Sequence, residues 1–128
     1  MPKHAVKVKT GPAGAGAYSQ IIRAGDFVYL SGQAPLDPSS NELVGTTIEE
    51  QTTRVLENIK LLLADAGAQM KDVIKLTVHL SDMASRAGFN AVSDSYFPDP
   101  KPVRTLVGST LVFKGMLVYV EVIAYIGS

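Results

Sequence analysis

The stretch TIEEQTTRVLENIKLLLADAG, residues 47–67, decides much of the fold of this chain. Thr47 and Glu50, three positions apart, form the signature of a capping box at a helix N-terminus. Apolar side chains then recur at helical spacing at Val55, Ile59, Leu62, Leu63 and Ala66. Gly67 supplies a helix stop. We therefore predict one long amphipathic helix that buries a single face.

Strand patterns lie on both sides of this helix. Downstream, apolar residues alternate with Lys75, Thr77 and His79 over residues 74–80, which is the period of a strand with one buried face. Upstream, residues 18–23 and 27–31 flank the turn residues Gly25 and Asp26 and predict a β-hairpin.

The last third of the chain predicts a second helix and two more strands. Ser81 and Asp82 can cap a helix, which Pro98 ends. The apolar stripe of this helix is predicted at Phe89, Val92, Tyr96 and Phe97. Strands are predicted over residues 103–107 and 117–126, with a link around Phe113, Lys114 and Gly115.

One sheet, antiparallel or mixed, with two helices packed on one face is the simplest arrangement of these elements. We therefore predict an α+β fold in which residues 1–128 form a single domain, a length that suits one domain. The other sheet face would carry Leu117, Tyr119 and Ile123 beside Glu121. This is more apolar surface than a monomer usually exposes, so we expect a homo-oligomer that covers it.

Composition argues against several functional classes. Twelve basic and twelve acidic residues give no net positive field, so nucleic acid is not expected as a partner. There is no cysteine, and the only histidines, His4 and His79, are far apart, so no metal site is expected. No run approaches the length of a membrane span, and a soluble, cytoplasmic protein is the expectation.

The most informative single residue is Arg104, in the stretch PVRTLV at residues 102–107. The stretch is otherwise apolar and predicts a buried strand. A guanidinium stays charged at ordinary pH and is seldom buried without a partner, so Arg104 implies a nearby anion. The anion is either a protein carboxylate, such as Glu121 if it lies on a neighbouring strand, or a ligand.

Several blocks of the sequence resemble the RidA/YjgF family of enamine and imine deaminases. The likeness runs from about Gly14 to Ala124, with the blocks in family order. The blocks are GAYSQ (16–20), LSGQAPLDP (30–38), EEQT (49–52), FNA (89–91) and PVR (102–104). The resemblance implies a chorismate-mutase-like subunit in a homotrimer with clefts between subunits. It also implies hydrolysis of 2-aminoacrylate-type enamines and imines to a 2-oxo acid and ammonia, without a metal or organic cofactor.

The resemblance also implies roles for individual residues. Arg104 matches the arginine that binds the substrate carboxylate, for which a bidentate guanidinium is well suited. Tyr18 matches a tyrosine that borders the cleft, and Ser31 and Gly32 match the strand end that lines it. Asn90 matches a residue close to the site, although an Asn in a helix is more often a local hydrogen-bonding group.

The chain departs from the family pattern at its last strand. The family has a glutamate that can orient the attacking water fifteen positions after the arginine, and Tyr119 stands there in this chain. Glu121 matches the next acidic position, on the same face but roughly 6 to 7 Å away. Leu106 occupies a position where some members have cysteine. A larger or aromatic substrate is a reasonable consequence of Tyr119.

Two other functions are compatible with the family resemblance. A non-catalytic regulatory module could use the same cleft to sense a small 2-oxo or 2-amino acid, and the missing glutamate favours this alternative. Ribonuclease activity, ascribed to some relatives, is disfavoured by the balanced charge and by the absence of a histidine pair.

Overall fold

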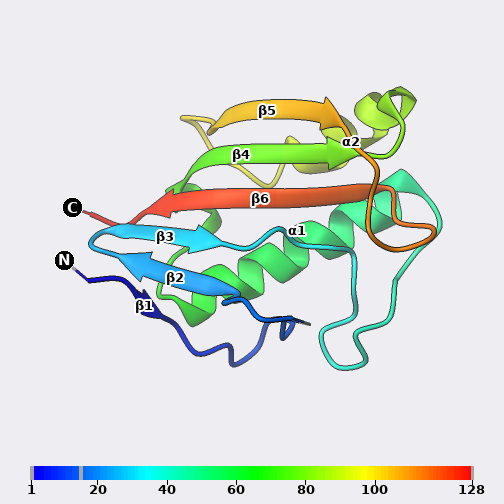
Figure 1. The fold of residues 1–128 in the computed structure, drawn as a ribbon. Helices are drawn as coiled ribbons and strands as arrows, with labels where there is room; N and C mark the ends of the chain where they lie inside the picture. Colours follow the sequence, from blue (N-terminus) through cyan, green and yellow to red (C-terminus); the bar gives the residue numbers. More distant parts are fainter. Residues whose placement is uncertain (1, 15, 128) are drawn as a thin grey trace.

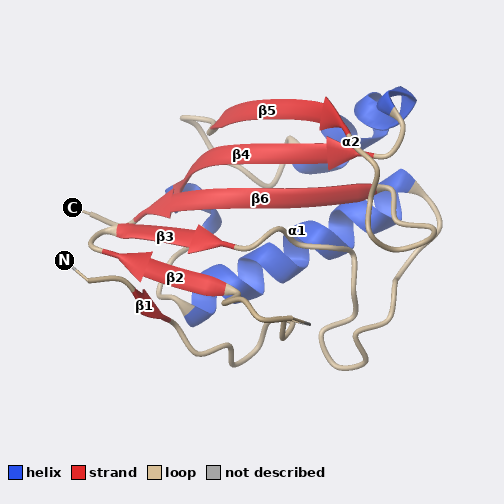
Figure 2. Cartoon of the chain, in the orientation of Figure 1, coloured by secondary structure: helices blue, strands red, loops and turns tan. Residues whose placement is uncertain are grey.

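The computed structural model describes residues 2–14 and 16–127, which form one mixed sheet and a layer of helices (Figures 1 and 2). Its strands are β1 (His4–Ala5), β2 (Ile21–Ala24), β3 (Phe27–Leu30), β4 (Val73–Leu80), β5 (Val103–Gly108) and β6 (Val118–Tyr125). Its helices are α1 (Ile48–Asp65), the short 3-10 helices η1 (Met70–Asp72) and η2 (Met83–Ser85), and α2 (Arg86–Ser93).

The strand order across the sheet is β1-β2-β3-β6-β4-β5. Among the described strands, only β4 and β5 pair in parallel, and the chain crosses between them through η2 and α2. Every other neighbouring pair is antiparallel. Both α1 and α2 lie on one side of the sheet (Figure 1). The predicted α+β fold, with two helices on one face of a single sheet, is therefore confirmed.

Helix α1 forms as its sequence predicts. The Thr47 hydroxyl accepts a hydrogen bond from the Glu50 amide, and the Glu50 carboxylate accepts one from the Thr47 amide, which completes the capping box. The helix ends at Asp65, and Gly67 follows in the left-handed region at φ 79°. This helix packs its apolar face against the sheet, so most of the core lies between α1 and the strands.

The core is almost entirely aliphatic. Its largest fully buried hydrophobic side chains are Phe89, Ile21, Leu56, Ile59, Leu62, Leu63 and Leu80, with Val28, Val55, Val78 and Val118. Alternate residues of β6 point into this core, while the residues between them face the other side of the sheet.

The structure corrects three details of the sequence prediction. The second helix ends at Ser93, so Tyr96 and Phe97 lie in the following turn, where Phe97 is still buried. His4, which the sequence placed in no element, pairs with Arg23 in the short strand β1. In β4 the alternation breaks at Ile74, which is exposed because the register with β6 shifts between Val73 and Lys75.

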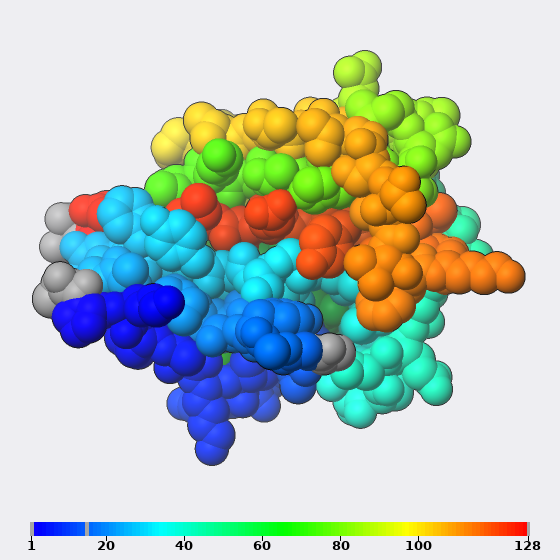
Figure 3. Space-filling model, in the orientation of Figure 1, coloured from blue at the N-terminus to red at the C-terminus, as the bar shows by residue number. Residues whose placement is uncertain are grey.

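The sheet face opposite the helices, here called the open face, is uncovered in the single chain. Side chains of β3, β4 and β6 lie bare on it in the space-filling view (Figure 3). Its exposed aromatic residues include Phe27, Tyr29 and Tyr125, whose rings lie close together. Among the described helices, none is both long and apolar enough to cross a membrane.

Candidate functional site

Arg104 lies on β5, which is the edge strand of the sheet rather than the buried strand predicted from its sequence. Five of its six residues are exposed, and Val103 keeps 68% of its surface accessible. The apolar residues of the stretch misled the prediction, because the single chain leaves them at an uncovered edge. Arg104 is therefore held at the rim of the molecule, opposite Leu76 of β4.

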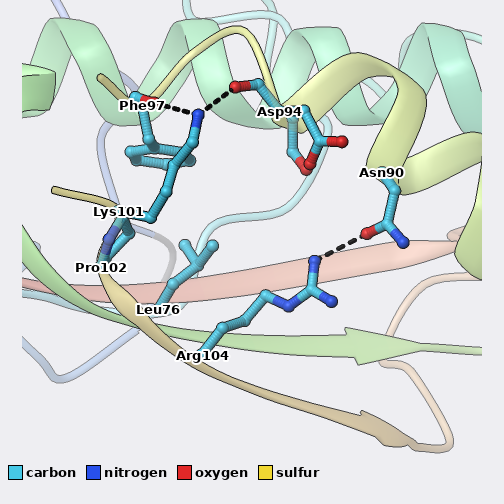
Figure 4. Close-up of a pocket in the computed structure, with 8 residues that line it drawn as sticks. Leu76, Asn90, Asp94, Phe97, Lys101, Pro102 and Arg104 are labelled. Carbon is cyan, nitrogen blue, oxygen red and sulfur yellow. Dashed lines mark hydrogen bonds between the residues drawn. The ribbon is translucent and has the colours of Figure 1, made fainter. Parts of the chain in front are cut away.

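The Arg104 guanidinium has a neutral partner in the chain. Its Nη1 donates a hydrogen bond of 2.6 Å to Oδ1 of Asn90 on α2 (Figure 4). Within residues 2–14 and 16–127, no carboxylate lies within ion-pair distance of Arg104. Glu121 is excluded as its partner, because β4 separates β6 from β5 and Glu121 lies on the open face.

A cavity of about 420 Å³ adjoins Arg104 and Asn90, between the β5 edge and α2. Leu76 and Phe97 form part of its apolar wall. The Lys101 ammonium also lines it, but it donates hydrogen bonds to the backbone carbonyl oxygens of Asp94 and Phe97 (Figure 4). The Lys101 ammonium therefore stabilises the turn that follows α2. Of the two cations that line this cavity, Arg104 is the one whose hydrogen-bond partner is a neutral side chain.

A second cavity, of about 370 Å³, collects other residues singled out from the sequence. Tyr18, Gly32 and Tyr119 line it together, although they come from three separate parts of the chain. The remaining walls are Pro12, Ala13, Gln20, Gln33, Ala34, Leu36, Val112 and Phe113. We call this the aromatic cavity. Arg104 and Asn90 do not line it, so one chain holds this pair in one group and Tyr18, Gly32 and Tyr119 in another. Ser31, Leu106 and Glu121 line neither cavity.

Tyr119 packs directly against the backbone of Gly32. A Cβ atom at position 32 would overlap the Tyr119 ring, so this contact requires glycine. Burial raises the pKa of the Tyr119 phenol, and the nearby Tyr18 and Glu121 raise it further. The phenol therefore stays protonated at neutral pH, where it can hold a water molecule by hydrogen bonding but cannot act as a general base.

The Glu121 carboxylate contacts His79, a residue that was not predicted to belong to the site. The Glu121 carboxylate lies 2.9 Å from His79 Nε2, and His79 Nδ1 lies 2.9 Å from the Ser109 hydroxyl. The His79 ring also meets the Tyr119 ring edge-on, with centroids 5.9 Å apart. His79 is thus a half-buried, hydrogen-bonded residue, because its strand neighbours on the open face supply both partners.

The other predicted residues have structural contacts of their own. The Ser31 hydroxyl donates to the Ser19 carbonyl oxygen at 2.6 Å, so its proton is committed to the backbone. Leu106 packs half-buried against the core. Val112 and Phe113 were not predicted as cavity residues, because their segment reads in the sequence only as a link between strands. An aromatic residue in a connecting loop was the available signal.

Comparisons with known proteins agree with the family resemblance. A family model described as endoribonuclease L-PSP matches residues 8–126. A RutC family protein of Pyrococcus abyssi is 42% identical over 125 residues, which cover 98% of each chain. The chloroplastic Reactive Intermediate Deaminase A of Arabidopsis thaliana is 38% identical over 103 residues, which cover 80% of this chain and 55% of that protein.

A solved structure extends the comparison to the fold. Escherichia coli TdcF, crystallised with bound serine, superposes with a TM-score of 0.86 at 28% identity. The match covers 95% of this chain and 98% of that one. The agreement spans both helices and the sheet, so the elements that carry the two groups of site residues belong to a shared framework.

Proposed function

The chain belongs to the RidA/YjgF family, and from this premise we propose that it hydrolyses 2-enamines and 2-imines to 2-oxo acids and ammonia. The enamine first tautomerises to the imine. The oxygen of a water molecule then forms a bond to the imine carbon, and both protons of this water pass to the imine nitrogen. The carbon–nitrogen bond breaks, which leaves the 2-oxo acid and releases the nitrogen as ammonia. The protein supplies a carboxylate anchor and an ordered water.

The observation that carries this proposal is the state of Arg104. Its charge is held at an exposed edge with one neutral side-chain partner, Asn90, whose bond uses one of five N–H donors. A planar carboxylate is the ligand that a guanidinium binds best. In support, the related TdcF was solved with serine, a small molecule with an α-carboxylate.

The reaction requires the two groups of site residues to meet, and we propose that a homotrimer achieves this. The β5 edge of one subunit, with Arg104, would pack against the open face of its neighbour, next to Tyr18, Gly32 and Tyr119. The exposed apolar side chains of these surfaces support such packing. They include Phe27, Tyr29, Ile74, Val103, Val107 and Tyr125. Sedimentation of a monomer at micromolar concentration would contradict the trimer.

In this arrangement each predicted residue has a definite role. Arg104 binds the carboxylate and Asn90 orients the guanidinium. Tyr18, Ser31 and Gly32 shape the opposing wall, and Leu106 packs beneath the substrate. Tyr119 holds the attacking water by a hydrogen bond. Glu121, which is held in place by its contact with His79, polarises that water or approaches Arg104 of the adjacent subunit.

The test is hydrolysis of an imine generated in solution by an amino acid oxidase. We expect Arg104→Ala to lower kcat/KM by about 100-fold, the scale for removing a charged partner of a bound carboxylate. Arg23→Ala is the matched control, because Arg23 lies on β2, four strands away in the sheet order, and its rate should stay within about twofold of wild type. Equal rates for wild type and Arg104→Ala would overturn the proposal.

A second candidate is a non-catalytic sensor that binds a small 2-oxo or 2-amino acid in the same place. The observation that favours it is Tyr119, a phenol with a raised pKa where the family has a carboxylate. Calorimetric binding of such an acid, lost in Arg104→Ala and without imine turnover by wild type, would favour this candidate over the deaminase.

A further inference from the structure

We propose that the aromatic cavity receives the side chain of the substrate, and that the enzyme therefore selects imines with large apolar, above all aromatic, side chains. The inference rests on the proposed function, since it names the substrate class of the same site. The residues that line the aromatic cavity are separate from Arg104, so a substitution among them would leave the carboxylate anchor in place.

The walls of the aromatic cavity are mostly apolar. Three aromatic rings surround the cavity, from Tyr18, Tyr119 and Phe113, and aliphatic groups of Leu36 and Val112 complete it. Val112 is 80% exposed and Phe113 is 44% exposed in the single chain. An apolar occupant would remove this surface from water, which is the main source of affinity in most small-molecule sites.

The amide groups of the two glutamines in the cavity wall already have hydrogen-bond partners. The Gln20 amide donates to the Pro12 carbonyl oxygen at 2.8 Å, and the Gln33 amide donates to the Ser31 carbonyl oxygen at 2.9 Å. No charged side chain is found among the described residues that line the cavity. A charged substrate side chain would therefore lose hydration without gaining a partner of opposite charge, which is costly.

The volume of the cavity also favours an aromatic side chain as its occupant. A cavity of about 150 Å³ lined by aliphatic and aromatic side chains is known to hold benzene. The aromatic cavity, at about 370 Å³, is large enough for a phenyl ring and its methylene group. The methyl group of a three-carbon imine would leave most of it filled with water.

Tyr119 lies where it can contact such an occupant. A Cβ atom at position 32 would overlap the Tyr119 ring, and this ring also lines the cavity. A substrate ring entering the cavity would meet the Tyr119 and Phe113 rings, and aromatic pairs add to the gain from burial alone. The residue that replaces the family glutamate thus contributes to selectivity.

The experiment compares imines generated from phenylalanine, alanine and aspartate in the same assay. We expect kcat/KM for the phenylalanine-derived imine to exceed that for the alanine-derived imine by about tenfold or more, and the aspartate-derived imine to be the poorest. Phe113→Ala should reduce this preference at least severalfold. The matched control is Lys114→Ala, in the same loop but outside the cavity lining, which should leave the preference unchanged.

A binding measurement separates the two proposals. Phenylpyruvate and pyruvate, the corresponding 2-oxo acids, are titrated into wild type and Phe113→Ala by calorimetry. If phenylpyruvate binds more tightly than pyruvate, and Phe113→Ala weakens its binding, the inference is supported even when no imine is hydrolysed. Absence of imine hydrolysis would contradict only the deaminase assignment. Equal affinity for the two acids, or a faster reaction with the alanine-derived imine, overturns the inference while leaving the deaminase intact.

Discussion

The two faces of the sheet are built for different purposes. The face under α1 and α2 is sealed by aliphatic side chains, and Ile59, Leu62 and Val120 are fully buried there. The open face carries tyrosines, a histidine and a glutamate that remain partly accessible. Because buried apolar area dominates stability, the helix-covered face holds the chain folded, which leaves the open face and the β5 edge available for chemistry.

The strongest test of this contrast is the same chemical change on both sides. Ile59→Ala, on the covered side, should lower the free energy of unfolding by roughly 2–5 kcal/mol, because it leaves a cavity in a close-packed core. Ile123→Ala, on the open face, should cost the folded subunit about 1 kcal/mol or less. Denaturant unfolding measures both, and similar losses would erase the proposed division between the faces.

Replacing a buried polar side chain on the covered side should lower the free energy of unfolding by an intermediate amount. Gln51, fully buried in α1, donates to the carbonyl oxygens of Gly45 and Gly115 and accepts from the Leu117 amide. Gln51→Leu should cost about 1–3 kcal/mol, since it leaves these backbone groups unpaired. The exposed Gln69 serves as the control, and its change to leucine should alter denaturant unfolding little.

Replacing Asp65 should have a smaller effect on the free energy of unfolding, and this effect should depend on pH. Burial would raise the pKa of this carboxyl, but hydrogen bonds from Lys9, Thr10 and Gly11 outweigh it and lower the pKa below its ordinary value. Such a group stabilises the fold above its unfolded pKa, near 3.9, and the contribution is lost as pH falls through the lower folded value. Asp65→Asn should cost about 1 kcal/mol at pH 7.

The comparison for Asp65 is made by thermal unfolding across pH. The difference in Tm between wild type and Asp65→Asn should narrow progressively below about pH 4, where the unfolded-state carboxyl becomes protonated. A gap that stays constant from pH 7 to pH 3 would show that the carboxylate charge is not what stabilises the contact with residues 9–11.

The smallest effect is expected on the open face. The Glu121 side chain is half exposed, and its bond to His79 is solvent-accessible. Glu121→Gln should therefore change the free energy of unfolding by less than about 1 kcal/mol. A larger loss in denaturant unfolding would mean that the open face contributes to folding as well as to the site.

Local patterns predicted the elements that depend on short-range physics. Thr47 and Glu50 located the start of α1, and the pattern that placed Tyr119 and Ile123 on the uncovered face of β6 agrees with its burial. The prediction for β5 failed because the apolar content of a strand does not reveal whether it has one neighbour or two. The family resemblance, rather than periodicity, supplied the suggestion that Arg104 binds a carboxylate.

The site was less predictable than the fold because it depends on contacts between distant segments. No pattern indicates that His79 stands between Ser109 and Glu121, since that requires the register of three strand segments. Likewise, Pro12, Leu36 and Phe113 come together only when loops from both halves of the chain fold against β6. The roles of Tyr18, Glu121 and Tyr119 remain predictions for the experiments above.

The position of β4 between β6 and β5 has a consequence for deuterium exchange. Strand β4 is paired with a neighbour on either side, while the β5 amides that point away from β4 have no strand partner among the described residues of the single chain. Amides of β4 should therefore take up deuterium among the slowest, and outward amides of β5 within the shortest labelling times. Slow uptake along β5 at high protein concentration, lost on dilution, would report directly when that edge becomes covered.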